Sequence, residues 1–110
     1  MSTATVGIPA DLVPDDHHVC VFQVVGDSMT PGIRDGDLVI VDADLQARDG
    51  DVAAVWINNW NGVSGRVVKR LSHGGTVLKS TNPKYPPMVL GPEHRPRVEG
   101  VVVGVMRVPR

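Results

Sequence analysis

Apolar residues occur in short runs rich in valine, and Gly, Asp, Asn and Pro residues separate one run from the next. The clearest runs are 21–25, 38–41, 52–55, 67–71 and 98–105. No long stretch places apolar residues at the spacing of a helix face. Short apolar runs between turn-forming residues are typical of strands. The sequence therefore predicts a mainly β fold of short antiparallel strands, with Asn61-Gly62 and Ser64-Gly65 at the tip of a hairpin.

Ser28 follows the predicted strand 21–25 and lies within a sharp turn. Gly26 precedes it and Pro31-Gly32 follows it, so the backbone changes direction on both sides of the serine. A strand exit of this kind exposes a hydroxyl and can direct backbone N–H groups at a developing oxyanion. The alternative interpretation is an ordinary turn in which the serine caps the local backbone.

Lys69 lies in the predicted strand 66–71, between β-branched neighbours, and is a candidate for burial. The chain has eight arginines and only three lysines, so a surface cation here would more often be arginine. A buried lysine can lose its proton near neutral pH and act as a general base, which arginine cannot. We expect burial and the charges of Arg66 or Arg70 to lower its pKa. The alternative is a strand lysine whose amine reaches solvent.

Taken together, these segments resemble the LexA/UmuD family of serine-lysine peptidases, which is in the same clan as type I signal peptidases. The resemblance covers about 85 of the 110 residues. It comprises the nucleophile segment and next strand (22–42), the strand 49–55, the lysine strand (67–71), the Asn-containing loop (78–87) and the closing strand (98–107). It implies a β-ribbon fold of short, strongly bent antiparallel strands, with residues 1–19 as an irregular arm and 20–110 as one peptidase domain.

The resemblance also assigns roles to individual residues. Ser28 would be the nucleophile and Lys69 the general base. The backbone N–H groups of Asp27 and Ser28 would form the oxyanion hole, and Met29 and Asn82 would lie at the substrate cleft. No cofactor is expected. Trp56 and Trp60 are two of only four aromatic residues, and they either pack the hairpin or form a platform for a peptide beside the cleft.

The family's biology supplies two functional readings. The first is a peptidase that cleaves itself or another chain in SOS-response or phage-repressor regulation, triggered by a RecA filament. The second is a non-catalytic homodimerisation module, such as an accessory of an error-prone polymerase or a repressor fragment. Strand 98–105 would form the dimer, since so apolar an edge strand needs a partner. The chain has no Ala-Gly or Cys-Gly pair of the kind usual at the family's self-cleavage site, which argues against self-cleavage. A fragment left after cleavage, a naturally short UmuD′-like product and a peptidase acting in trans all remain open.

Composition bears on whether the protein binds DNA, spans a membrane or holds a metal ion. The net charge of −1 and the absence of a basic run argue against direct DNA binding, and no apolar stretch is long enough to span a membrane. Cys20 is the only cysteine and is expected to be a core thiol, which fits a cytoplasmic protein. His17-His18 lacks further residues at metal-ligand spacing, so we interpret it as a solvated turn.

Overall fold

The computed structural model describes residues 17–107. Strands account for most of the regular structure, with two single turns of 3-10 helix between them. The strands are β1 (Val19–Gln23), β2 (Leu38–Asp42), β3 (Val52–Trp60), β4 (Val63–Ser72), β5 (Val77–Lys79), β6 (Met88–Val89) and β7 (Arg97–Met106). The turns are η1 (His73–Gly75) and η2 (Pro92–His94). The predicted mainly β class is confirmed.

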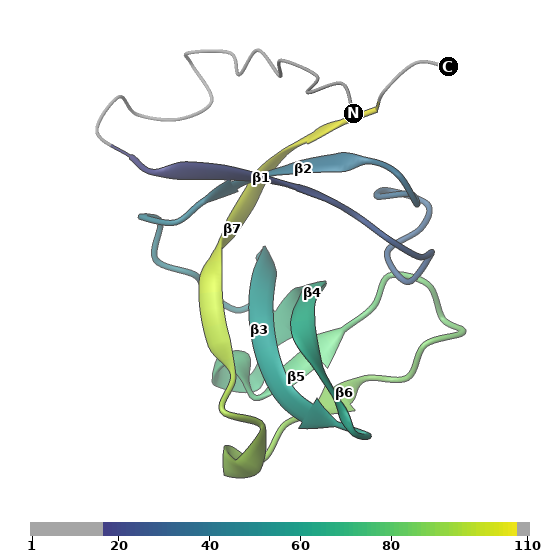
Figure 1. Cartoon of the computed structure of the whole chain (residues 1–110), viewed down its shortest axis with the longest axis vertical. Helices are drawn as coiled ribbons and strands as arrows, with labels where there is room; N and C mark the ends of the chain where they lie inside the picture. Colours follow the sequence, from purple (N-terminus) through teal and green to yellow (C-terminus); the bar gives the residue numbers. More distant parts are fainter. Residues whose placement is uncertain (1–16, 108–110) are drawn as a thin grey trace.

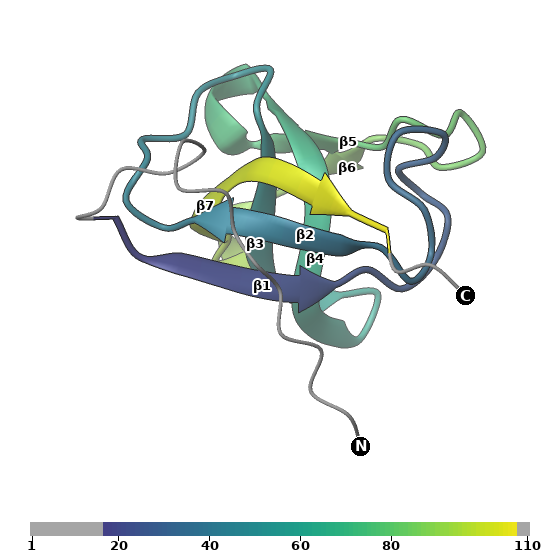
Figure 2. The ribbon, with the colours of Figure 1, turned by 90° about the horizontal axis from the view of Figure 1, so that it is seen from above.

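All seven strands form one antiparallel sheet in the order β1-β2-β7-β3-β4-β5-β6. The sheet is strongly bent, as the resemblance implied. In Figure 1, β1 and β2 lie across the top of the molecule while β3 and β4 run steeply below them, and β7 passes from one half to the other. Figure 2 shows β1, β2 and β7 side by side from above. The bend brings the outer strand β1 back toward the β3–β4 hairpin.

β7 supplies this bend because its pairing is irregular with both neighbours. Its register shifts against β2 between Ile40 and Val41, and against β3 between Ala54 and Val55. Such bulges bend a strand and increase its twist. β7 pairs with β2 along one edge and with β3 along the other, so it lies in the interior of the sheet. The premise that strand 98–105 is an edge strand is wrong, because both edges of β7 are paired within the described residues.

Two hydrophobic clusters fill the bent sheet. One lies under β3, β4, β5 and β6, and its most buried members are Ala53, Val55, Ile57, Leu71 and Leu78. The other joins β2 and β3 to the loop after Ser28, and comprises Met29, Ile33, Val39, Val41 and Ala54. Neighbouring residues Ala53 and Ala54 belong to different clusters because successive strand side chains point to opposite faces. The second cluster thus fixes the loop that carries the serine.

β1 is an edge strand, and for this reason the side chains of residues 19–25 are less buried than the sequence suggests. Cys20 is exposed, so its prediction as a core thiol is wrong. Val21 is also exposed, and Val25 lies beyond the strand and is largely exposed. An edge strand covered by one neighbour buries less than the apolar run 21–25 suggests. Only Phe22 and Val24 in this segment pack against the core.

The β3–β4 hairpin agrees with its predicted position. The two residues between the strands, Asn61 and Gly62, both have positive φ, at 50° and 82°. Consecutive positive φ values are the geometry of a type I′ turn, for which Asn-Gly is the preferred sequence. Ser64-Gly65, in contrast, lies within β4. Trp60 packs against the first cluster, as the hairpin-packing interpretation required.

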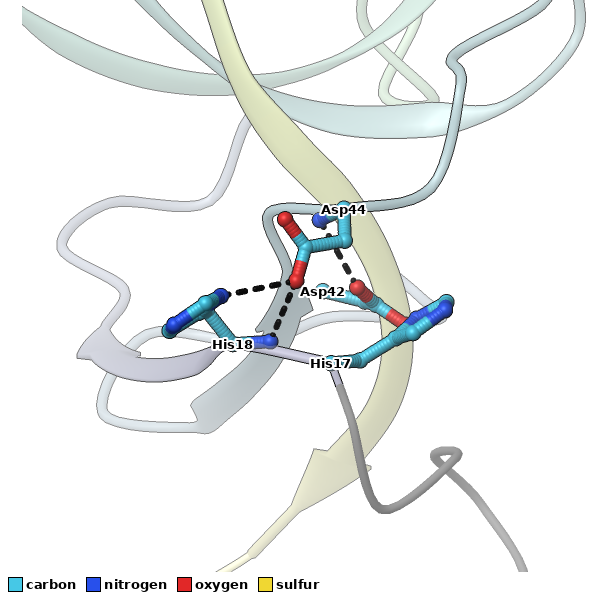
Figure 3. Close-up of polar contacts among 4 residues, drawn as sticks. All are labelled: His17, His18, Asp42 and Asp44. Carbon is cyan, nitrogen blue, oxygen red and sulfur yellow. Dashed lines mark hydrogen bonds and ion pairs between the residues drawn. The ribbon is translucent and has the colours of Figure 1, made fainter.

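The residues just before β1 are held by acidic side chains at the end of β2 (Figure 3). The Nδ1 atom of His17 lies 2.5 Å from Oδ2 of the buried Asp42. His18 donates its backbone N–H to Asp44 over 2.7 Å, and Asp44 donates its own N–H to Asp42 over 2.9 Å. The interpretation of His17-His18 as a solvated turn is therefore wrong for His17. The rest of the predicted arm, residues 1–16, lies outside the described residues.

Replacing Gly100 tests the close contact between β7 and β2. A Cβ atom at this position would lie 2.5 Å from Val41 Cγ1 and 2.6 Å from the Asp42 carbonyl oxygen. We expect Gly100→Ala to lower the free energy of unfolding by about 1–3 kcal/mol, since overpacking forces backbone shifts of this cost. Urea denaturation measures the change. Gly65→Ala is the matched control, because nothing lies within 4 Å of a Cβ there. Equal stability of the two variants would contradict the predicted role of Gly100.

Candidate active site

The loop between β1 and β2 holds Ser28 in a compact turn. Gly26 has φ +96° and donates its N–H to Asp35 Oδ1 over 2.8 Å. The N–H of Val24 donates to the Asp37 carbonyl, and the Gly36 N–H donates to the Val24 carbonyl, each over 2.8 Å. These bonds close the base of the loop. Ser28 itself is half-buried, and the next side chain is almost completely buried in the second cluster.

Lys69 is buried in β4, with only 7% of its surface exposed. It pairs across the hairpin with the fully buried Ala53. Burial lowers the pKa of Lys69 below the ordinary lysine value, since an ammonium loses solvation in this position. The expected contribution of neighbouring arginines is wrong. Arg66 is paired with Glu99, and Arg70 donates to the Gly50 carbonyl over 2.5 Å, so burial alone accounts for the shift.

Ser28 and Lys69 line the same cleft, of about 460 Å³. Residues from β1 and its extension form one side, and β4 residues Arg66 to Lys69 form the other. Within the described residues, β1 pairs only with β2, and β4 pairs only with β3 as far as Lys69. The cleft therefore lies between two strand edges that have unused hydrogen-bonding groups. An extended peptide can add to such edges, which fixes a carbonyl at a defined register.

Lys69 contacts a hydroxyl that sequence reasoning missed. Its Nζ donates to Ser80 Oγ over 2.6 Å, and the described residues contain no hydrogen bond between Lys69 and Ser28. The Tyr85 ring centroid lies 5.5 Å from the same Nζ. Both residues belong to the loop 80–87, part of the segment 78–87 that the family resemblance places beside the cleft. The hydroxyls in that loop were the available indication, but only the folded chain shows which of them reaches the lysine.

Asn82 joins this loop to the loop that carries Ser28. Its side-chain Nδ2 donates to the Asp27 carbonyl over 3.1 Å, and its backbone N–H donates to the Ser28 carbonyl over 2.9 Å. In a trans peptide the carbonyl and the following N–H point in opposite directions. Asn82 therefore turns the N–H groups of Ser28 and Met29 away from itself. Asn82 lies behind the serine loop, whereas Ser28 and Met29 line the cleft.

The predicted oxyanion donors are unused in this structure. No hydrogen bond in residues 17–107 takes the N–H of Asp27 or Ser28. The Asp27 side chain accepts a hydrogen bond from the Tyr85 hydroxyl, which raises the pKa of that phenol. Asp27 is thus held by loop 80–87 through its side chain and its carbonyl. Two fixed peptide units with available donors are suited to binding a developing negative charge.

A family comparison identifies the kind of protein to which this site belongs. The Peptidase S24-like model matches residues 2–103. The chain belongs to the Peptidase S24-like family. Across residues 17–107, no helix is long and apolar enough to cross a membrane. In the same range, no group of three or more His, Cys, Asp or Glu side chains is placed to hold a metal ion.

Curated relatives of this S24 domain are LexA repressors. The chain is 38% identical over 91 residues to LexA repressor 2 of Pseudomonas syringae pv. tomato, covering 79% of this chain and 42% of that protein. It is 36% identical over 103 residues to the LexA repressor of Syntrophotalea carbinolica, covering 91% and 48%. It is 32% identical over 106 residues to the LexA repressor of Gluconacetobacter diazotrophicus, and the match covers 94% of this chain and 40% of that protein. The chain thus spans less than half the length of these relatives.

Burial of Lys69 predicts a specific pH dependence of stability. The unfolded chain keeps this proton up to about pH 10.4, whereas the folded protein releases it at lower pH. Between those two pKa values the unfolded state holds more protons, so the free energy of unfolding rises with pH. In Lys69→Met this contribution is absent. The stability difference, wild type minus variant, should therefore increase between pH 7 and 10 in urea titrations. A flat or falling difference would contradict a lowered pKa of Lys69.

Proposed function

We propose that this S24 domain is a serine-lysine peptidase that hydrolyses a peptide bond through Ser28 and Lys69. The observation that carries the proposal is the cleft that both residues line, between two open strand edges. A nucleophile, a base with a lowered pKa and a surface for an extended peptide are the parts that acyl transfer requires. Relatives named as repressors support a regulatory substrate.

The proposed reaction uses Lys69 for every proton transfer. Neutral Lys69 takes the Ser28 hydroxyl proton while Ser28 Oγ attacks the peptide carbonyl. The N–H groups of Asp27 and Ser28 bind the resulting oxyanion. The amine then leaves with the proton from Lys69, and an acyl-enzyme remains on Ser28. Water, losing a proton to Lys69, attacks the acyl carbon. The bond between that carbon and Ser28 Oγ then breaks, Lys69 returns the proton to Ser28 Oγ, and the acid is released. Lys69 exchanges its bond with Ser80 for one with Ser28 when substrate binds, as apo sites often require.

The family assignment suggests a class of natural substrates rather than one protein. We propose a LexA-type or UmuD-type chain, cleaved in cis or in trans, within SOS-response or phage-repressor regulation. A RecA filament as trigger and an error-prone polymerase as partner belong to the same proposal. The peptide would lie as an added strand between β1 and β4.

Cleavage in trans tests the catalytic assignment. The purified chain is incubated with a LexA-type substrate whose own serine is inactive, and products are quantified from pH 6 to 10. We expect a rate that rises with pH as Lys69 loses its proton. Ser28→Ala and Lys69→Ala should each lower the rate by about a thousandfold or more. Lys69→Arg is the matched control, since it keeps a cation but cannot act as a base.

Two outcomes would overturn the proposal. One is continued hydrolysis by purified, folded Ser28→Ala protein. The other is a rate that falls steadily from pH 6 to 10, which a lysine base does not produce. Circular dichroism spectra of all variants confirm that each loss of rate concerns chemistry rather than folding.

A second candidate function is a homodimerisation module, favoured by the exposed apolar side chains of β7. Val98 and Val105 are 43% and 42% exposed although β7 is internal to the sheet. The surface available to a partner is therefore a face of β7 at each end, rather than a free edge. A twofold arrangement of two copies would cover both valines. The domain could then act as a dimerisation module without cleaving a peptide.

Oligomeric state tests this second function. We expect light scattering at micromolar concentration to give the mass of two chains, and Val105→Glu to shift the mass toward one chain. A charge in a buried apolar interface is costly, whereas an exposed charge is not. Val63→Glu, at a valine on the hairpin that is 68% exposed, is the control and should leave the mass unchanged. A wild-type monomer under these conditions excludes the dimer.

A further inference from the structure

A second, smaller pocket lies on the β3–β4 hairpin. It has a volume of about 140 Å³. Its lining is almost entirely apolar and consists of Ile57, Trp60, Val63, Gly65, Arg66, Val67 and Met88. The hairpin pairing is irregular between Ile57 and Trp60, and this irregularity sets Trp60 opposite Val63. The Trp60 ring also packs on the His94 ring, with 5.2 Å between the centroids. We call this site the hairpin pocket.

The hairpin pocket adjoins the cleft that Ser28 and Lys69 line. Arg66 and Val67 line both cavities. Along β4, residues 63, 65, 67 and 69 share one face, because strand side chains alternate. Lys69 thus stands at one end of a row of residues, and Gly65 lies four residues along it, about 13 Å away at 3.3 Å per residue. Within the described residues, the outer edge of this part of β4 has no strand partner.

We propose that the hairpin pocket binds an apolar side chain of the peptide substrate, about four residues from the bond that is cut. The inference rests on the proposed peptidase function. A peptide added to the edge of β4 advances in step with it, so the residue four positions from the one beside Lys69 faces Gly65. Gly65 has no side chain and leaves the pocket open, since nothing lies within 4 Å of a Cβ there.

Size and charge define the preferred side chain. A cavity of about 150 Å³ lined by apolar residues holds a benzene molecule, so the hairpin pocket suits Leu, Met or Phe. Arg66 is fixed at the boundary between the two cavities by Glu99 and by the Phe22 ring, whose centroid lies 3.9 Å from its guanidinium carbon. A lysine or arginine side chain entering the pocket would be repelled by the positive charge of Arg66. Aspartate would lose its solvation among Trp60, Ile57 and Met88.

A peptide scan combined with a filled pocket tests the proposal. Peptides spanning the cleaved segment of the LexA-type substrate carry Leu or Asp in turn at each position within six residues of the scissile bond. We expect kcat/KM to fall by about 10- to 100-fold for Asp at one position, three to five residues from that bond. In Gly65→Leu this preference should disappear, because the introduced side chain fills the pocket that would otherwise accept Leu. Gly65→Ala should give an intermediate preference.

Binding measurements separate this proposal from the catalytic one. Ser28→Ala protein, with and without Gly65→Leu, is titrated with the fluorescent Leu and Asp peptides and followed by anisotropy. Tighter binding of the Leu peptide that is lost in Gly65→Leu supports the pocket even if no peptide is cleaved. Equal binding of both peptides, or a Leu preference that survives in folded Gly65→Leu protein, overturns it. Peptide-independent association of two copies, abolished by Gly65→Leu, would assign the pocket to a second chain and also overturn it.

Discussion

The bulged pairing of β7 with β2 and with β3 is the constraint on which the candidate site depends. Ser28 follows β1 and Lys69 lies on β4, and three other strands separate β1 from β4 in the sheet order. In a flat sheet with about 4.8 Å between strands, β1 and β4 would be about 19 Å apart. They line one cleft only because the sheet curls. The bulges of β7 supply the curl, and Gly100 permits the close approach to Val41 that it requires.

β7 also holds the serine loop, through an ion pair at its end. Asp37 is 2% exposed and receives two hydrogen bonds from Arg107, of 3.0 and 3.1 Å, and a third from the Arg34 N–H. The Arg107 guanidinium is the main reason that the pKa of Asp37 lies below its usual range. Removal of Arg107 would leave the buried carboxylate of Asp37 without its counter-charge and without solvent, which destabilises the folded protein. The loop position is therefore determined by the strand that also determines the curl.

Local sequence features indicated residues that line the cleft better than they indicated what surrounds them. Ser28 and Lys69 became candidates through local patterns, namely a glycine turn after a strand and a lysine among valines, and the resemblance to the LexA/UmuD family supplied their roles. The same reasoning failed for Cys20, since exposure of a strand residue depends on whether a second strand covers it. It failed for the central position of β7 for the same reason, because strand order is set by pairings between distant residues.

The contacts made by loop 80–87 show the same limit at the site itself. Ser80 and Tyr85 have no local feature that distinguishes them from other loop residues. They reach Lys69 and Asp27 only because Asn82 fixes the loop against the carbonyls of Asp27 and Ser28. Sequence could indicate that the loop lies near the cleft, but not which side chains it would present there. Of the expectations for Lys69, burial was correct and the arginine contribution was not.

The place of β7 in the chain has a consequence for biosynthesis. β2 and β3 have no common partner until β7 lies between them, and β7 is the last described strand to leave the ribosome. About 55 residues separate the end of β2 from the start of β7, which corresponds to roughly 3–11 s of translation at 5–20 residues per second. During this interval the nascent chain consists of two incomplete β units with exposed apolar edges. Vectorial synthesis therefore delays both the core and the cleft until β7 has emerged, and apolar strand edges stay exposed until then.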